Sequence, residues 1–301
     1  MAETYYYGSI GNLNGGVEPP VERKYTIIQS LWTKPFTDKT RLRDAMFIAA
    51  LSLAFAHRSG YKVHMHTDKK GMELMKNFGY DELLPTLDNI PKSVPKELFA
   101  AGKFYAMFAE GFMNKIHIDF DVFLKKKGIL DRFYEDSTID GICQMEEDMP
   151  LIDHTNIIIP MHILGYPAST RPNWKGSMNT GIVGFNNTAL ASKYMNNYEA
   201  ALRMYTQEQF DAYKAEHPNH WLAFDFILEQ VALSHMSVGY NMYCLLPTKE
   251  PSYVADEIGY QHFQGTSKWK EENLTNMKRW LRKLDNRLYI VALAASRKAL
   301  R

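Results

Sequence analysis

The chain has 301 residues, of which 46% are hydrophobic, and its 35 Lys and Arg nearly balance its 34 Asp and Glu. This length suits one large α/β domain or two ordinary ones, and the composition excludes a disordered chain, a collagen and a coiled coil. A net charge of +1 gives no general attraction to nucleic acid, and two cysteines, Cys143 and Cys244, exclude a disulfide scaffold and a zinc ribbon.

The N-terminal residues 1–24 are rich in Gly, Asn and Pro and predict an irregular arm. They lack the basic start and apolar core of a secretory signal. The most apolar window, Ala45–Ala56, is far shorter than a membrane span of roughly 20 residues. We therefore expect a cytoplasmic protein.

From residue 25 onward, strand-like and helix-like segments alternate. In chain order we expect a strand at Tyr25–Ser30, a helix at Thr40–Arg58, a strand at Tyr61–Thr67, helices at Gly71–Tyr80 and Lys96–Met113, strands at Lys115–Leu124, Ile139–Met145, Asn156–Ile163 and Met178–Phe185, helices at Thr188–Tyr205 and Trp221–Ser237, and strands at Tyr240–Leu246 and Ile258–Phe263. This order predicts an α/β fold with a mainly parallel, twisted sheet flanked by helices in a single large domain, residues 25–270. Ligands of such sheets bind beyond the carboxyl ends of the strands.

Residues 271–301 are expected to form a C-terminal basic amphipathic helix. Apolar residues recur there at helical spacing, and residues 278–301 hold eight Lys and Arg against one Asp. Such a helix either docks on the domain or lies on an anionic membrane surface. We favour docking, with peripheral membrane contact as the alternative.

The triplet Asp119-Phe120-Asp121 falls within the expected strand Lys115–Leu124. In an extended chain both carboxylates point to one side, whereas Ile118 and Val122 point to the other. Two carboxylates at this spacing repel each other unless a cation lies between them. Oxygen ligands suit a hard divalent ion such as Mn²⁺ or Mg²⁺.

A second motif, HxxGxxK, spans His262, Gly265 and Lys268 just after the last expected strand. A neutral imidazole can complete the coordination shell of a metal. Glycine lets the backbone approach a phosphate closely, and lysine supplies a mobile positive charge for a diphosphate. The alternative for both motifs is a solvated loop at a strand end.

Together, the two motifs resemble those of nucleotide-sugar glycosyltransferases of the GT-A fold, in particular the glycogenin and galactosyltransferase-like branch. The resemblance implies a GT-A-like, Rossmann-like fold and a Mn²⁺ or Mg²⁺ ion held by Asp119, Asp121 and His262, with Gly265 and Lys268 at the diphosphate. The branch usually has Pro-Trp after the lysine, whereas Trp269 follows Lys268 directly here.

The same resemblance suggests further residues that would bind the nucleotide sugar. Lys103 lies in the helix before the Asp-x-Asp strand, and Asn179 and Thr180 belong to a strand that resembles the one lining the sugar pocket. Trp32 and Asp68 follow the first two strands, where this fold holds the base and ribose. For each of these, an ordinary structural role is the alternative.

No motif in the sequence identifies the carboxylate that would act as a catalytic base. Asp225 and Glu229 are one helical turn apart and share a face of the expected helix Trp221–Ser237, so we select them. Glu146 and Glu147 are rivals. His64 and His66 share a face of the strand Tyr61–Thr67, and we interpret them as polar strand positions rather than a metal pair.

We therefore expect a Mn²⁺-dependent glycosyltransferase of the hexosyltransferase type that moves a sugar from a nucleotide-diphosphate donor, UDP in the first instance, to an acceptor. One alternative is a protein that binds a nucleotide sugar or glycan without turnover. Another is a phosphohydrolase of the haloacid-dehalogenase type, because IHIDFDVF also resembles the nucleophile motif of that class.

Overall fold

Among the residues that the structure describes, the central sheet has seven strands in the order β3-β2-β1-β4-β7-β6-β8. This is a computed structural model, and it describes residues 23–148, 176–204, 206–218, 223–247 and 251–301. The expected strand Asn156–Ile163 and almost all of the expected arm lie outside these described residues. The strands are β1 (Tyr25–Leu31), β2 (Tyr61–Thr67), β3 (Glu82–Leu84), β4 (Lys115–Ile118), β6 (Gly141–Asp148), β7 (Gly176–Phe185) and β8 (Met242–Cys244).

Strand β7 runs antiparallel to both of its neighbours, β4 and β6, and the other neighbouring pairs are parallel. The mainly parallel α/β arrangement expected from the sequence is thus confirmed. A small second sheet pairs β5 (Val122–Leu124) with β9 (Tyr260–His262) in antiparallel fashion.

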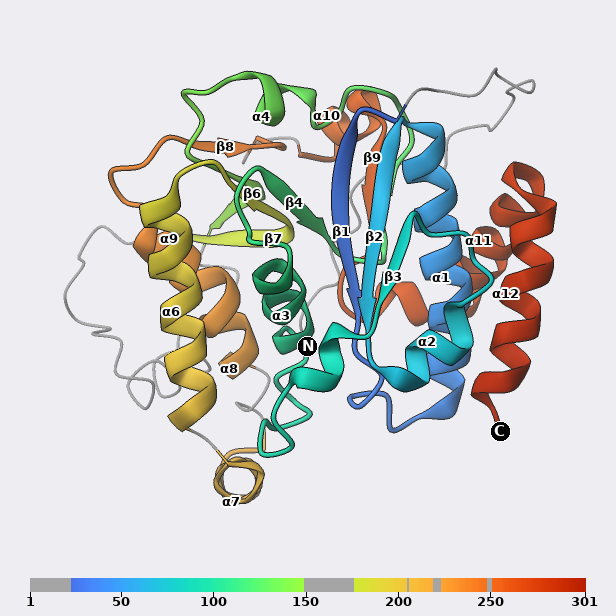
Figure 1. The fold of residues 1–301 in the computed structure, drawn as a ribbon, viewed down its shortest axis with the longest axis horizontal. Helices are drawn as coiled ribbons and strands as arrows, with labels where there is room; N and C mark the ends of the chain where they lie inside the picture. The colour runs from blue at the N-terminus through green and yellow to red at the C-terminus, as the bar shows by residue number, and fades with distance from the viewer. Residues whose placement is uncertain (1–22, 149–175, 205, 219–222, 248–250) are drawn as a thin grey trace.

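Helices cover both faces of the large sheet (Figure 1). One face packs on α1 (Lys39–Arg58), α11 (Glu271–Leu284) and α12 (Asn286–Ala299), and the other on α3 (Ala101–Ala109), α6 (Thr188–Met204) and α9 (Ala232–Met236). The remaining helical elements are α2 (Lys69–Met75), η1 (Thr86–Asn89), α4 (Asp131–Glu135), α7 (Gln207–Glu216), α8 (Ala223–Phe226), the π-helical turn η3 (Ile227–Val231), α10 (Pro251–Ile258) and η4 (Ser267–Trp269). Each face has its own apolar cluster.

Helix α1 is the central helix of its layer, and almost every residue from Leu42 to Ala56 is buried. The carboxylate of Asp38 accepts a hydrogen bond from the amide of Thr40 and so caps the first turn. Because its neighbours are β2, β5, α11 and α12, the helix needs apolar residues on most sides, as its sequence predicted.

Two expected elements are shorter than the sequence suggested. The single strand expected at Lys115–Leu124 is broken into β4 and β5, because the amide of Val122 donates to the carbonyl of Asp119 at 3.0 Å and closes a tight turn. Helix α3 replaces the expected helix Lys96–Met113. It ends before Gly111, where the backbone has a positive φ of 74° and reverses toward β4.

The structure describes the expected helix Trp221–Ser237 from residue 223 onward. There the π-helical turn η3 separates α8 from α9. The expected C-terminal helix is two helices, since Asp285 has a non-helical backbone and its carboxylate caps α12 through the amide of Leu288 at 2.8 Å. Elements β3, α4, α7 and α10 were not expected, and all of them are ten residues or fewer.

The apolar stripe of the C-terminal segment faces α1 and not solvent. Leu274, Met277, Trp280 and Leu281 are all buried there. Part of the basic face is also engaged, because Lys298 pairs with Glu73 at 3.2 Å. Among the helices that the structure describes, none combines the length and the apolar character that crossing a bilayer would require.

Candidate functional site

The Asp-x-Asp motif forms the turn between β4 and β5. Ile118 and Val122, on either side, are buried in the core. The two carboxylates differ in exposure, because Asp121 is only 1% exposed whereas the side chain of Asp119 is 31% exposed. The turn, and not the extended strand that the sequence suggested, therefore brings the carboxylates together with one of them open to solvent.

His262 reaches this turn through the pairing of β5 with β9. In that register Val122 lies opposite His262, and the amide of Phe263 donates to the carbonyl of Asp121 at 3.2 Å. Nε2 of His262 then lies 3.5 Å from Oδ1 of Asp121. One potential ligand atom each from Asp119, Asp121 and His262 falls within 4.8 Å of the others.

The imidazole of His262 is held from behind by β6 and β7. Its Nδ1 lies 2.7 Å from Oε1 of Gln144, which also accepts a hydrogen bond from the hydroxyl of Tyr260 at 2.8 Å. An amide oxygen only accepts, so Nδ1 carries a proton and Nε2 is the ring atom that faces Asp121. This is how metal-binding histidines are commonly fixed.

Gly181 of β7 leaves the space in which this imidazole lies. A Cβ atom at residue 181 would be 2.5 Å from Cε1 of His262 and 2.5 Å from Oε1 of Gln144. No side chain fits there, so the glycine is required by the packing of His262. Neither Gln144 nor Gly181 was selected from the sequence, because nothing in it indicates that β6 and β7 pass behind β9.

Lys103, from α3, forms a buried ion-pair network with the exposed end of the motif. Its ammonium group lies 2.9 Å from Oδ1 of Asp119, 2.7 Å from the carbonyl of Thr180, and in direct contact with the carboxylate of Glu229. The three contacts satisfy its three donors. Although burial opposes it, Asp119 and Glu229 raise the pKa of Lys103 above its ordinary value, so it is a permanent cation here.

Lys268 forms an ion pair with the other carboxylate of the motif, that of Asp121. The loop after β9 passes through Gly265, whose φ of 57° is left-handed, and continues into η4. There the ammonium of Lys268 lies 2.6 Å from Oδ2 of Asp121. Burial alone would raise the pKa of Asp121, but Lys268 and His262 outweigh it and hold that pKa well below the usual range. Asp121 is thus ionised throughout the physiological pH range.

The chemistry of this cluster fits a hard divalent cation. Asp119, Asp121 and Glu229 contribute three negative charges, and Lys103 and Lys268 contribute two positive ones. These five groups together carry one net negative charge, which favours a cation. Two carboxylates and one imidazole are donors that Mn²⁺ accepts, and the exposed side of Asp119 leaves an approach from solvent.

Of the two carboxylates selected as candidate bases, Glu229 lies in this network and Asp225 lies beside it. Asp225 accepts a hydrogen bond from the amide of Ala100 at 3.0 Å, and the hydroxyl of Tyr198 donates to it at 3.4 Å. Burial, reinforced by Glu229, raises the pKa of Asp225 well above the usual value and favours its neutral form. Asp225 therefore supports the start of α3.

The backbone at Glu229 is unusual, because this residue lies within the π-helical turn η3. Such turns are rare and occur frequently at functional sites. Asp225 lies just before this turn, in α8, and is still close enough to Glu229 for that carboxylate to raise its pKa.

The residues of β7 approach the cluster from one side. Oδ1 of Asn179 accepts from the amide of Gly181 at 3.0 Å, and its Nδ2 donates to Glu147 at 2.7 Å. Glu147 is thus close by, whereas the side chain of Glu146 is exposed. Within the described residues, Oγ1 of Thr180 is buried and has no hydrogen-bond partner.

Trp32 and Asp68 lie at the neighbouring carboxyl ends of β1 and β2. Oδ2 of Asp68 accepts from the amide and the hydroxyl of Thr33 at 2.8 and 2.7 Å, and its Oδ1 caps α2 through Gly71. Trp32 is 6% exposed and packs against Gly102 of α3. The structure therefore shows Asp68 as a link between β1, β2 and α2. Trp32 packs against the residue that precedes Lys103 in α3.

His117 is a further residue that sequence reasoning missed. It is 1% exposed, its Nε2 lies 2.9 Å from the hydroxyl of Ser30, and its Nδ1 lies 3.8 Å from Oδ1 of Asp119. Burial and the nearby Lys103 hold its pKa well below the usual value. Its position two residues before Asp119, on the same face of the strand, was the available signal.

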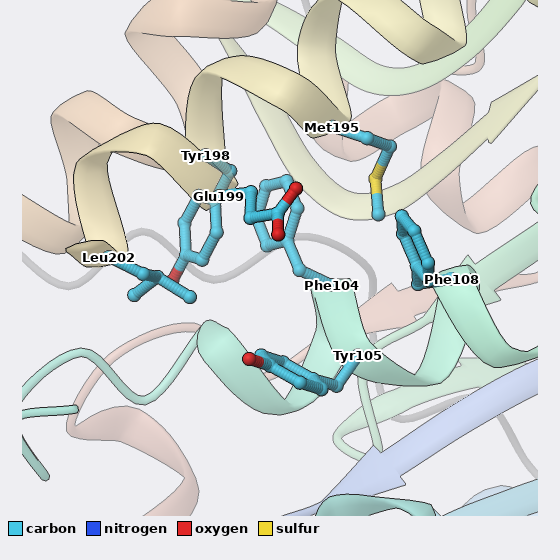
Figure 2. A pocket seen from close by; sticks show the side chains of 7 residues that line it. All are labelled: Phe104, Tyr105, Phe108, Met195, Tyr198, Glu199 and Leu202. Atoms are coloured by element: carbon cyan, nitrogen blue, oxygen red, sulfur yellow. The ribbon is translucent and has the colours of Figure 1, made fainter. Parts of the chain in front are cut away.

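A separate apolar pocket lies between α3 and α6 (Figure 2). Phe104 and Tyr198 stack there with ring centroids 3.4 Å apart, and the hydroxyl of Tyr198 contacts Asp225. The pocket is lined by Phe104, Tyr105, Phe108, Met195, Tyr198, Glu199 and Leu202. It includes none of the residues of the Asp119 cluster.

The model of one protein family matches residues 25–291, and this family is described as a family of unknown function, DUF6734. The comparison with curated proteins finds no match. Among solved structures, mouse xyloside xylosyltransferase 1 in its apo form aligns over 75% of this chain and 86% of that chain, at 12% identity and a TM-score of 0.35. A similarity of this size supports no argument about the chemistry of the present chain.

Proposed function

The chain belongs to this family of unknown function, and we propose that it is a metal-dependent glycosyltransferase that uses a nucleotide-diphosphate sugar, with UDP as the first candidate nucleotide. The observation that carries the proposal is the convergence of Asp119, Asp121 and His262 within 4.8 Å, with Lys268 at 2.6 Å from Asp121 across 147 residues of sequence.

In this proposal Asp119, Asp121 and His262 hold a Mn²⁺ or Mg²⁺ ion, which acts as a Lewis acid on the diphosphate. Lys268, in η4 just after the loop that contains Gly265, provides a positive charge for the departing diphosphate. Lys103 is a positioning residue, because its ion pairs to Asp119 and Glu229 fix both carboxylates.

The sugar-binding side of the site is formed by β7 and by the carboxyl ends of β1 and β2. Oγ1 of Thr180, which has no hydrogen-bond partner in the part of the chain that the structure describes, is the atom that we propose for a sugar hydroxyl. Asn179 is tied to Glu147 and Gly181, so its contribution requires an exchange of those bonds. Trp32 and Asp68 remain the proposed contacts of the nucleoside.

Glu229 is the carboxylate that we propose to act during transfer, and Asp225 supports it. In the reaction, a bond forms between the anomeric carbon of the sugar and an acceptor hydroxyl oxygen. The bond from that carbon to the diphosphate oxygen breaks, and the hydroxyl proton passes to a carboxylate or to solvent. Glu229 is the better candidate because it contacts the ammonium of Lys103 that also holds Asp119.

The test combines ligand-dependent unfolding with a transfer assay. UDP at a hundredfold excess over its Kd should stabilise the protein by about 2.7 kcal/mol with Mn²⁺, and much less with a chelator. Asp121→Asn should lose the Mn²⁺-dependent part, and Asp211→Asn, on the exposed helix α7, should keep it.

Equal stabilisation by UDP with and without metal would contradict the metal site. Turnover then separates two remaining possibilities. Transfer to an acceptor, or slow hydrolysis of a UDP-sugar that is lost in Asp121→Asn, supports the enzyme. Metal-dependent binding of UDP-sugars without any turnover would indicate a protein that binds them without transferring the sugar.

A further inference from the structure

A second cluster of metal-binding side chains lies on the α3 side of β2. Val63 and Met65 point into the core shared with α1, so His64 and His66 point the other way, as the alternation of a strand requires. Glu82 of β3 is the register partner of His64. Glu110, the residue that ends α3, completes the cluster.

These side chains converge on one carboxylate oxygen. Oε1 of Glu110 lies 2.8 Å from Nδ1 of His64 and 3.1 Å from Nε2 of His66. Oε2 of Glu82 lies 3.9 Å from Nδ1 of His64. Ligand atoms of His64, Glu82 and Glu110 all fall within 4.8 Å of one another.

Three separations within the cluster can be compared with those of a tetrahedral coordination shell. Zinc binds imidazole nitrogen and carboxylate oxygen at about 2.0–2.2 Å, so its ligand atoms lie roughly 3.4 Å apart. The observed distances of 2.8, 3.1 and 3.9 Å scatter around that value. The ligand atoms of His64, Glu82 and Glu110 already lie together, whereas His66 joins them through Glu110 and must turn toward His64 to share an ion.

The outer contacts of the cluster are also those of a metal site. Nδ1 of His66, on the far side of the ring, lies 2.8 Å from the hydroxyl of Thr86 in η1. The second oxygen of Glu110 pairs with Lys115 at 3.3 Å. Such contacts orient the ligands of a metal. His66 is fully buried, whereas the side chain of Glu82 is 54% exposed, so an ion can enter from solvent.

We propose that His64, His66, Glu110 and Glu82 bind a divalent transition-metal ion of the zinc class. Two imidazoles with two carboxylates favour Zn²⁺ or Co²⁺ over Mn²⁺ and Mg²⁺. Mn²⁺ and Mg²⁺ are the ions that we propose for the Asp119 cluster, in which most ligand atoms are oxygens. The ion would join the three-residue edge strand β3 to β2 and to the end of α3. It would thus stabilise the helix that carries Lys103.

The experiment uses the full chain without a histidine tag, treated with a chelator, and Co²⁺ alone as the probe. The variant Asp119→Asn/Asp121→Asn removes the first cluster from the titration. In that background we expect one equivalent of Co²⁺ with the visible absorption of a four-coordinate ion, displaced by Zn²⁺. His64→Gln and Glu110→Gln should each weaken Co²⁺ binding about tenfold or more.

Glu82→Gln changes an exposed residue and so tests the site even if a buried variant fails to fold. It should also weaken Co²⁺ binding. His235→Gln on α9 and Glu73→Gln on α2 are the matched controls and should bind Co²⁺ unchanged. Absence of Co²⁺ binding in the Asp119→Asn/Asp121→Asn background would overturn the proposal. So would binding that neither His64→Gln, Glu110→Gln nor Glu82→Gln weakens, because the cluster would then be a hydrogen-bonded network only.

Discussion

The ammonium group of Lys268 lies 2.6 Å from Oδ2 of Asp121, a carboxylate that is 1% exposed. The same carboxylate is a proposed metal ligand, and the same ammonium is a proposed diphosphate ligand. The ion pair therefore neutralises Asp121 before any ligand binds. When a metal and a diphosphate enter, Lys268 can exchange Asp121 for the diphosphate without either charge becoming unpaired.

This relationship separates the effects of two substitutions. Lys268→Met should weaken UDP binding by about 10–100-fold, because a hydrogen bond to a charged group contributes about 1.5–3 kcal/mol. Excess Mn²⁺ should not restore it. His262→Ala should weaken Mn²⁺ binding instead, and excess Mn²⁺ should restore UDP binding. Titrations of UDP at two Mn²⁺ concentrations measure both effects.

Lys270→Met is the control for these titrations, because it removes an exposed lysine two residues further on. Its UDP affinity should equal that of the unchanged protein. Recovery of Lys268→Met at high Mn²⁺ would show that Lys268 only supports the metal ligands.

Gly181→Ala tests the support of His262. The new Cβ would lie 2.5 Å from Cε1 of His262 and 2.5 Å from Oε1 of Gln144, so the imidazole must move. Overpacking of this kind costs about 1–3 kcal/mol, and we expect a matching loss of stability together with weaker Mn²⁺-dependent UDP binding. Thermal unfolding and the UDP titration measure the two losses.

Gly184→Ala is a matched control on the same strand. Its Cβ would lie 2.6 Å from the carbonyl of Lys115 and 3.1 Å from Ile116 and Ile142, away from the cluster. It should lower stability without changing the response to Mn²⁺. If both variants respond to Mn²⁺ like the unchanged protein, Gly181 has no special relation to His262.

The sequence predicted the sheet, the layers and the two motifs, because these depend on local patterns. Alternation on β2 and the apolar run of α1 are read directly from a few neighbouring residues. The residues of the candidate metal site were also selected from the sequence, by motif. What the sequence did not contain was the β5–β9 register that places His262 opposite Val122.

The supporting residues could not be selected for the same reason. Gln144 and Gly181 matter only because β6 and β7 pass behind His262. The division of roles between Asp225 and Glu229 depends on their partners, Ala100 and Tyr198 for the first and Lys103 for the second, which the i+4 spacing does not indicate. The interpretation of His64 and His66 as simple polar positions overlooked Glu82 and Glu110, which are brought to them by β3 and α3.

Lys103→Met should separate stability from metal affinity. It leaves Asp119 and Glu229 without their shared cation, and breaking a buried ion pair costs about 3–5 kcal/mol. Mn²⁺ should restore part of this stability, because it supplies the missing charge, so the rise in Tm on adding Mn²⁺ should exceed that of the unchanged protein. The control Lys69→Met removes an exposed lysine. An equal Mn²⁺ effect in all three proteins would contradict a metal at Asp119.

Trp280→Ala tests how the C-terminal helices are held. Trp280 is 5% exposed and belongs to the core cluster shared with α1. Truncation of a buried aromatic side chain costs about 3–5 kcal/mol, so denaturant unfolding should show a loss of this size, and the exposed neighbour Arg279→Ala should show almost none. Unchanged stability combined with lost binding to anionic vesicles would instead support a membrane-bound helix.

The last prediction concerns Lys125, whose ammonium lies 5.7 Å from the centre of the Trp280 ring. Burial lowers the pKa of Lys125 from 10.5 to about 8, against the attraction of Asp256. The unfolded chain therefore holds this proton between about pH 8 and 10.5, where the folded protein has lost it. Stability should rise with pH across this window through Lys125, since the unfolded state binds more protons. Below pH 8 the cost of burying the charge is present in full.

Lys125→Met keeps the apolar stem on Trp280 and removes the charge. At pH 7 the variant should be more stable than the unchanged protein by about 1–3 kcal/mol, since one pKa unit corresponds to about 1.4 kcal/mol. This difference should shrink toward zero as the pH rises from 8 to 10.5.

The comparison of two proteins cancels the titration of all other groups, and Lys127→Met, an exposed lysine two residues away, should show no such trend. Urea unfolding at a series of pH values gives the three curves. A difference between Lys125→Met and the unchanged protein that stays constant from pH 7 to 10.5 would show that Lys125 is charged in the folded state at all these pH values.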